Sequence, residues 1–183
     1  MLRVVSGKYK SRRIKEVNSS KTRPTTDRNK EALFNTIGQF FSGETVLDLF
    51  SGSGSLGIEA ISRGAGFTTF IDFNYLSINI IKDNLRVLGI ADNFEVQKTD
   101  AIRYLMVTYK KFDIIICDPP YALLKYDEIL RTIATRQLLN KGGIIIFEAG
   151  KETALPESFI NIYKYKEKHF GNTMFGFYTT EVE

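Results

Sequence analysis

The chain has 183 residues, of which 43% are hydrophobic and 25% are charged, values typical of one globular domain or of one domain with a small appendage. No stretch approaches the roughly 20 apolar residues of a membrane span, and the first residues lack a signal-peptide core, so we expect a cytoplasmic protein without membrane contact. The only cysteine, Cys117, excludes an internal disulfide and any multi-cysteine metal site, and we expect no metal.

The net charge of +4 is distributed unevenly along the chain. Residues 1–30 contain ten Lys and Arg against two acidic residues, a net charge of +8, and the remainder carries −4. A basic segment on an acidic body is typical of a protein that binds a polyanion such as nucleic acid. The alternative is a charged face that only contacts solvent.

The basic segment predicts a β-hairpin. Residues 2–6 and 11–17 are expected to form two short strands around a glycine-containing turn. Residues 18–24 have the composition of a linker. We therefore expect a basic RNA-binding appendage over 1–24 and a main domain over 25–183.

The main domain is expected to begin with a helix over about 27–41, capped by Thr25 or Thr26. The later elements, in chain order, are predicted as strand 45–49, helix 55–63, strand 67–71, helix 75–88, strand 94–97, helix 101–107, strand 112–117, helix 126–138, a turn at Gly142-Gly143, strand 144–147, and a hairpin of strands 161–168 and 173–180. Repeated strand–helix units predict an α/β fold with helices on both faces of a mostly parallel sheet. The final hairpin gives this seven-stranded sheet an antiparallel last strand.

A glycine-rich turn follows the first strand of the main domain. Gly52, Gly54 and Gly57 fit the pattern G-x-G-x-x-G, and Asp72 lies 20 residues after Gly52. This spacing is typical of nucleotide cofactor sites, and both NAD and S-adenosylmethionine fit it. Asp48 favours S-adenosylmethionine, because a carboxylate at this strand end opposes a pyrophosphate but suits an ammonium and a sulfonium.

Each acid near this turn has a predicted role. Asp48 is placed near the methionyl end of the cofactor, and Asp72 near the ribose hydroxyls. Asp100 follows the third strand and either accepts the adenine amine or only caps a helix. The candidate cofactor-binding residues are Asp48, Phe50, Ser51, Gly52, Ser53, Gly54, Asp72, Phe73, Asp100 and Ala101.

The sequence Asp118-Pro119-Pro120-Tyr121 directly follows the apolar strand 112–117. Two prolines end the strand and supply carbonyl acceptors without N–H donors. Together with the Asp118 carboxylate and the Tyr121 ring, they form an acceptor cluster that suits the exocyclic amine of a nucleobase. We therefore interpret these four residues as catalytic, the alternative being a strand-ending turn in which the tyrosine only packs.

These motifs, in this order, resemble the RsmD family of bacterial methyltransferases. The resemblance covers essentially the whole chain and is carried by residues 6–10, 22–28, 47–57, 118–121 and 170–173. It implies a Rossmann-like class I methyltransferase fold and methyl transfer from S-adenosylmethionine to the N2 amine of a guanine in 16S ribosomal RNA of the small subunit. The chain departs from the family at Asp72, where Glu is frequent, and at Glu148-Ala149, where Glu-His is common.

In this interpretation Asp118 and the Pro119 carbonyl accept the amine hydrogens, and Tyr121 stacks on a base that has left its helix. The candidate RNA-binding residues are Arg3, Lys8, Lys10, Arg12, Arg13, Arg23, Thr25 and Arg28. An adenine N6-methyltransferase, an NAD-dependent oxidoreductase and a non-catalytic RNA-binding assembly module are the alternatives. A monomer is expected.

Overall fold

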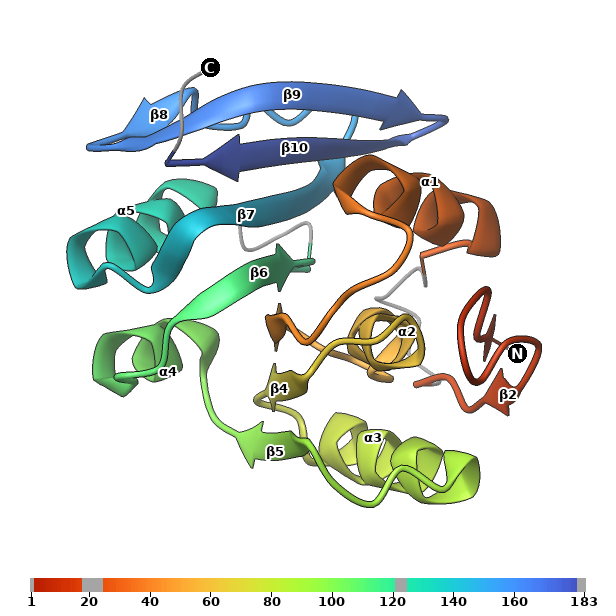
Figure 1. The fold of residues 1–183 in the computed structure, drawn as a ribbon. Helices are drawn as coiled ribbons and strands as arrows, with labels where there is room; N and C mark the ends of the chain where they lie inside the picture. The colour runs from red at the N-terminus through yellow and green to blue at the C-terminus, as the bar shows by residue number, and fades with distance from the viewer. Residues whose placement is uncertain (1, 18–24, 121–124, 181–183) are drawn as a thin grey trace.

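The computed structural model describes residues 2–17, 25–120 and 125–180, and a twisted eight-stranded sheet forms its centre (Figure 1). The strands lie in the order β5 (Phe94–Lys98), β4 (Phe67–Asp72), β3 (Thr45–Leu49), β6 (Phe112–Cys117), β7 (Leu139–Gly150), β10 (Thr173–Thr179), β9 (Ile162–Phe170) and β8 (Ser158–Phe159). The first five are parallel, and β10 is antiparallel to both β7 and β9. The mostly parallel sheet with an antiparallel last strand is thus confirmed, and the two-residue edge strand β8 is an addition to the seven expected.

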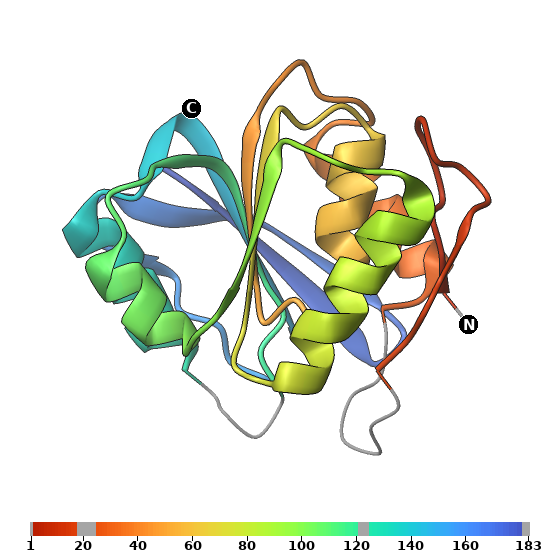
Figure 2. The same cartoon turned by 90° about the horizontal axis from the view of Figure 1, so that it is seen from below.

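Helices cover both faces of the sheet (Figure 2). One face carries α1 (Asp27–Ile37), α2 (Ser55–Ser62) and α3 (Tyr75–Leu88), and the other carries α4 (Ala101–Val107) and α5 (Tyr126–Arg136). The strands between them are apolar on both sides, as β6 illustrates with Ile114 and Ile116 packed towards α1 and α2 and Ile115 packed towards α4 and α5. Within the described ranges, no helix has the length and apolar character needed to cross a membrane.

Two elements of the main domain differ from the expectation. Helix α1 ends at Ile37 rather than near residue 41, because Gly38 takes a left-handed backbone with φ of +127°. The Gly142-Gly143 pair does not separate two elements but lies within β7, where the pairing with β6 shifts register between Phe112 and Ile114. Gly142 has φ of +73°, as expected for a glycine at such an irregularity.

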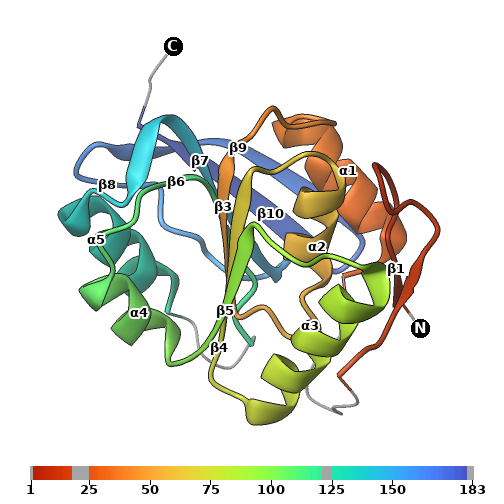
Figure 3. The ribbon, with the colours of Figure 1, turned by 60° about the horizontal axis from the view of Figure 1, so that its bottom comes forward.

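The basic hairpin forms, but its strands are far shorter than predicted. Only β1 (Leu2–Arg3) and β2 (Arg13–Ile14) pair as strands. Val4 still bonds Arg12 and Ser11 across the hairpin, but the next backbone N–H groups bind α2 instead. Val5 and Ser6 donate to the Glu59 carboxylate at 2.8 and 2.9 Å. The hairpin thus lies directly against α2 and α3, whose apolar residues share a core cluster with it (Figure 3). The predicted linker over 18–24 lies outside the described residues.

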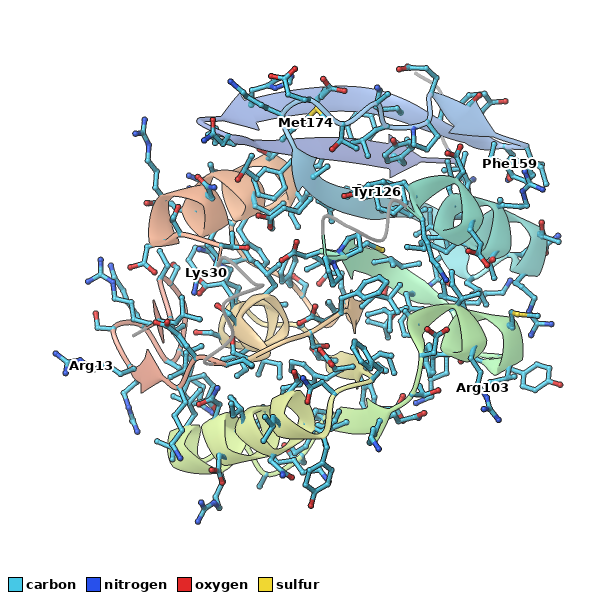
Figure 4. The ribbon with its side chains drawn as sticks, turned by 180° about the vertical axis from the view of Figure 1, so that it is seen from behind. Arg13, Lys30, Arg103, Tyr126, Phe159 and Met174 are labelled. Atoms are coloured by element: carbon cyan, nitrogen blue, oxygen red, sulfur yellow. The ribbon has the colours of Figure 1, made fainter. Side chains whose placement is uncertain are left out.

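Glu59 is the centre of a buried charged cluster between the hairpin, α1 and α2. Arg63 donates to Glu59 at 2.8 Å, and the Lys30 ammonium lies 3.6 Å from the same carboxylate. Lys30 also donates to the Arg3 carbonyl at 2.6 Å and to the Ser55 hydroxyl at 3.0 Å. Figure 4 shows Lys30 between α1 and α2, and burial lowers its pKa. These contacts connect the hairpin to the first residue of α2.

Candidate active site

Four carboxylates come from the ends of adjacent parallel strands. Asp48 lies in β3, Asp72 ends β4, Asp118 follows β6, and Glu148 lies near the end of β7. Because these strands are neighbours, their carboxyl ends meet at one edge, the position at which open α/β sheets bind ligands. None of the four forms an ion pair with any residue in the described ranges. The site therefore holds four carboxyl groups without a cationic partner in the described ranges.

The glycine-rich turn connects β3 to α2 at this edge. Gly52 and Gly54 have φ of +55° and +77°, and Phe50 also has a positive φ, +60°. A Cβ on Gly52 would meet no atom within 4 Å, so this side of the turn leaves space for a ligand. Gly57 serves another purpose, because a Cβ there would lie 2.3 Å from the Phe70 ring, where α2 packs on β4.

Asp48 belongs to β3, and its carboxylate lies at the start of helix α2. Its Oδ2 accepts the Gly57 N–H at 2.9 Å, and only 2% of the residue is exposed. Burial raises the pKa of Asp48 to about 7, and Asp72 acts in the same direction. A phosphate at this helix start would therefore meet a carboxylate where a nucleotide site offers free N–H groups. A cationic ligand, by contrast, is attracted there.

Asp72 is joined to the glycine turn by hydrogen bonds. Its Oδ2 accepts the Gly52 N–H at 2.9 Å, and its Oδ1 accepts the Asn74 N–H at 2.8 Å. Burial raises the pKa of Asp72 despite these bonds. The neighbouring Phe73 side chain is 64% exposed, which is unusual for phenylalanine and leaves a ring face at the edge of the site.

The remaining predicted cofactor residues lie around these acids. Ser51 joins β3 to β4, since its hydroxyl donates to the Asp48 carbonyl at 2.7 Å and accepts the Ile71 N–H at 3.0 Å. The Ser53 carbonyl accepts from Asn84 of α3 at 3.0 Å. Ala101 is buried at the start of α4.

Asp100 caps helix α4. Its Oδ1 accepts the Arg103 N–H at 2.9 Å, and the side chain is exposed. The cap interpretation is therefore confirmed. Contact between Asp100 and an adenine amine stays a prediction. The Thr99 N–H donates to the Asp72 carbonyl at 3.1 Å, so Asp100 lies beside the end of β4, where such a contact is possible.

The predicted catalytic residues begin where β6 ends at Cys117. Asp118 is partly exposed, Pro119 is buried and Pro120 is partly exposed. Burial raises the pKa of Asp118 well above its usual range, and the nearby negative charges of Glu148 and Asp48 add to this rise. Tyr121 lies outside the described residues.

Glu148 was not among the predicted site residues. It is 3% exposed, and its Oε2 accepts the Thr25 hydroxyl at 2.7 Å. Burial raises the pKa of Glu148 to about 7, and the Thr25 hydrogen bond acts in the opposite direction. The sequence did contain a signal, because Glu148 follows the apolar run Ile144–Phe147 as Asp118 follows the run in β6.

A pocket of about 430 Å³ lies beside Glu148. Its walls come from the start of α1, the end of β7, and the turn between β9 and β10. The lining residues are Thr25, Thr26, Arg28, Asn29, Glu148, His169, Phe170, Gly171, Asn172 and Thr173. Among the described residues of this lining Glu148 is the only acid, and most of the other side chains are polar or basic.

The predicted RNA-binding residues form two groups. Those on the hairpin are exposed, namely Arg3, Lys8, Lys10, Arg12 and Arg13. Arg13 points away from the body of the protein in Figure 4, whereas Arg3 pairs with Asp27 at 2.6 Å. Thr25 and Arg28 line the pocket, and Arg23 lies outside the described residues. The described residues contain no group of three or more His, Cys, Asp or Glu side chains placed to hold a metal ion.

Comparisons with known proteins place this architecture in one family. The family model described as Conserved hypothetical protein 95 matches residues 2–179. The Bacillus subtilis protein "Putative rRNA methyltransferase YlbH" is 40% identical over 94% of this chain and 95% of the relative. Ribosomal RNA small subunit methyltransferase D of Escherichia coli K12 is 30% identical over all of this chain and 91% of the relative. The solved structure of "Putative methyltransferase yhhF from Escherichia coli" covers all of this chain and 99% of its own, with a TM-score of 0.84 and 28% identity. The chain therefore belongs to the RsmD family.

Proposed function

We propose that this protein transfers a methyl group from S-adenosylmethionine to the exocyclic N2 amine of a guanine in 16S ribosomal RNA. The observation that carries the proposal is the position of Asp118, Pro119 and Pro120 at the same sheet edge as the glycine turn. Relatives named ribosomal RNA small subunit methyltransferase D support the choice of the small subunit as substrate.

The residues at the glycine turn fit S-adenosylmethionine better than NAD. Asp48 and Asp72 place negative charge at the turn, and Asp48 already occupies the Gly57 N–H that a pyrophosphate would need. The open side of Gly52 allows close approach of a nucleoside, Asp72 would accept its ribose hydroxyls, and Phe73 offers an exposed ring face to the adenine. When bound, S-adenosylmethionine supplies a methyl group on a sulfonium that accepts an electron pair when the carbon–sulfur bond breaks.

The chain's own residues would then prepare the guanine amine. The amine lone pair is delocalised into the ring, so it is a weak nucleophile in the free base. Acceptance of its two hydrogens by the Asp118 carboxylate and the Pro119 carbonyl favours a pyramidal nitrogen whose lone pair points at the methyl carbon. Positive charge that develops on the nitrogen as the new bond forms is stabilised by the uncompensated carboxylates.

Asp118 also suits the removal of the leftover proton. The methylated nitrogen carries one hydrogen too many and is strongly acidic. The raised pKa of Asp118 makes its carboxylate a better acceptor for that proton than an ordinary aspartate, and the partial exposure of Asp118 lets the proton pass to water. Pro119 and Pro120 contribute no N–H donors that would compete with the amine.

The hairpin would hold the RNA around the target base. Its exposed cations project from a body that is otherwise acidic, so phosphates are attracted to this end of the molecule. Arg28 lines the same pocket as Glu148 and adds a cation there. Stacking of Tyr121 on the flipped base completes the proposal.

The test is methyl transfer from labelled S-adenosylmethionine to small subunits from cells that lack this enzyme, followed by digestion to nucleosides. The expected product is N2-methylguanosine, and the Asp118→Asn variant should lose at least about a hundredfold in rate while keeping its affinity for S-adenosylmethionine in calorimetry. N6-methyladenosine as product would identify the adenine-directed alternative. An Asp118→Asn variant with wild-type rate would refute the assignment of Asp118.

A further inference from the structure

The pocket beside Glu148 lies at the carboxyl-end edge of the sheet, in a part of that edge where no predicted cofactor-binding residue lines it. Its described lining residues include none from the glycine turn or from the ends of β4 and β5. Because β6 lies between β3 and β7 in the sheet, the pocket lies on the other side of Asp118 from the cofactor site. A pocket in that position would receive the substrate base, and the described part of the lining presents a single carboxylate to whatever enters. Proteins that bind a flipped base read it through its Watson–Crick edge.

The strand register places Glu148 next to Asp118. In the parallel pair β6–β7, Ile116 is opposite Ile146 and Cys117 is opposite Phe147, so Asp118 and Glu148 come next on the two strands. Neighbouring strands lie about 4.8 Å apart. By the alternation of side chains, Glu148 is on the same side of β7 as Ile146, towards α1 and α2. The negative charge of Glu148 raises the pKa of Asp118, as expected for close neighbours.

Thr25 donates a hydrogen bond to one oxygen of the Glu148 carboxylate and makes no hydrogen bond to the other oxygen. Its hydroxyl donates to Oε2 at 2.7 Å from the start of α1. Oε1 has no hydrogen-bond partner among the described residues, although 97% of Glu148 is shielded from solvent. Among the described residues, Thr68 Oγ1 is the only fully buried side-chain oxygen or nitrogen without a hydrogen-bond partner, so Oε1 is accessible and can accept from a donor that enters the pocket.

Guanine has two kinds of donor side by side on its Watson–Crick edge, the N2 amine and the N1–H, whereas adenine has an acceptor at N1. We propose that Glu148 accepts the N1–H of the target guanine while Asp118 holds the adjacent N2 amine, so that Glu148 selects guanine over bases without an N1–H. This inference rests on the proposed function and names the residue that determines its base specificity. Glu148 is thus a specificity residue in contact with the substrate, and Thr25 positions it.

The experiment compares guanine with 2-aminopurine, which keeps the exocyclic 2-amine and has an acceptor at N1. Small subunits are reconstituted with either base at the position that the wild-type enzyme methylates, and initial rates are measured for both. Loss of a hydrogen bond to a charged group predicts that the wild-type enzyme prefers guanine by about tenfold to a hundredfold. In Glu148→Gln the amide can donate to N1 of 2-aminopurine, so this preference should fall by about tenfold or more.

The matched control is Glu152→Gln, the same chemical change at a side chain that is 88% exposed and outside the pocket lining. It should keep the wild-type preference. Equal rates on the two bases with the wild-type enzyme, or an unchanged preference in a folded Glu148→Gln, would overturn the role of Glu148. Even if the variant does not fold, the wild-type comparison can overturn the inference, because equal rates on the two bases leave no role for an acceptor of the N1–H.

Failure of this inference can be told from failure of the proposed function. If the wild-type enzyme makes no N2-methylguanosine on natural subunits, the proposed function falls and the inference falls with it. If it makes N2-methylguanosine but shows no preference for a base with an N1–H, only the inference falls.

Discussion

Asp48→Asn should make the protein more stable at pH 8 while it removes cofactor binding. The carboxylate is 2% exposed, has no cationic partner among the described residues, and has a pKa raised from 3.8 to about 7. Its ionisation is therefore unfavourable in the folded state. Asparagine keeps the oxygen that accepts the Gly57 N–H and never ionises.

The magnitude follows from the difference in pKa. The folded state binds the proton more tightly than the unfolded chain, so the free energy of unfolding falls as the pH rises from about 4 to about 7 and is constant above that. A difference of about three pH units at about 1.4 kcal/mol each gives a loss of at most about 4 kcal/mol at pH 8. Asp48→Asn avoids this loss, and in a chain of this length the melting temperature should rise by about 16 °C at most.

Urea unfolding of the cofactor-free protein at pH 4.5 and pH 8 measures the effect. The variant and the wild type should have similar stability at pH 4.5 and differ at pH 8, whereas Asp92→Asn, the same change at an exposed residue, should have little effect at either pH. Calorimetry should show that Asp48→Asn loses affinity for S-adenosylmethionine. A variant that is no more stable than the wild type at pH 8 would refute the reasoning about buried charge.

Three further predictions concern the hairpin. Charge reversal by Lys10→Glu with Arg13→Glu should weaken RNA binding by at least tenfold and reduce its salt dependence. Calorimetry should show unchanged affinity for S-adenosylmethionine. Unchanged RNA binding would contradict the role of these cations. Gly7→Ala should lower the free energy of unfolding by more than about 2 kcal/mol in urea unfolding, because the φ of Gly7 is +81° and the new Cβ would lie 1.8 Å from the Ser62 carbonyl oxygen. The control Gly89→Ala should lower it by only about 1 kcal/mol, because Gly89 has φ of +72° but open space around it. Lys30→Met should destabilise the protein by about 3 kcal/mol in urea unfolding, because it leaves the Glu59 carboxylate with Arg63 as its only remaining ionic partner among the described residues; equal stability would show that the buried ammonium contributes nothing.

Local signals in the sequence located most of the fold. Helix α3 spans Tyr75–Leu88 as predicted, because its apolar stripe has helical spacing and Gly89 ends it with a left-handed backbone. Strand β6 spans Phe112–Cys117 as predicted, because an apolar run was followed by two prolines that cannot continue a strand. Both signals lie within the element itself.

The differences arose where distant residues decide the structure. The hairpin strands are short because Glu59, more than 50 residues away, takes the N–H groups of Val5 and Ser6. Glu148 was missed for a similar reason, since its position beside Asp118 depends on strand pairing and its hydrogen bond comes from Thr25, 123 residues earlier. Neither partner can be identified from spacing along the chain.

The Glu59 carboxylate has a consequence for how this protein can be cut or recombined. It receives two backbone N–H groups from the hairpin, and without them it would lose two of the hydrogen bonds that stabilise its buried charge, keeping only its contacts to Arg63 and Lys30 among the described residues. Removing the first 17 residues would also uncover the apolar surface of α2 and α3 that Leu2, Val4 and Ile14 now cover. A truncated enzyme would thus lose solubility together with its RNA-binding cations. The basic segment also cannot be transplanted to another methyltransferase without the acid that anchors it.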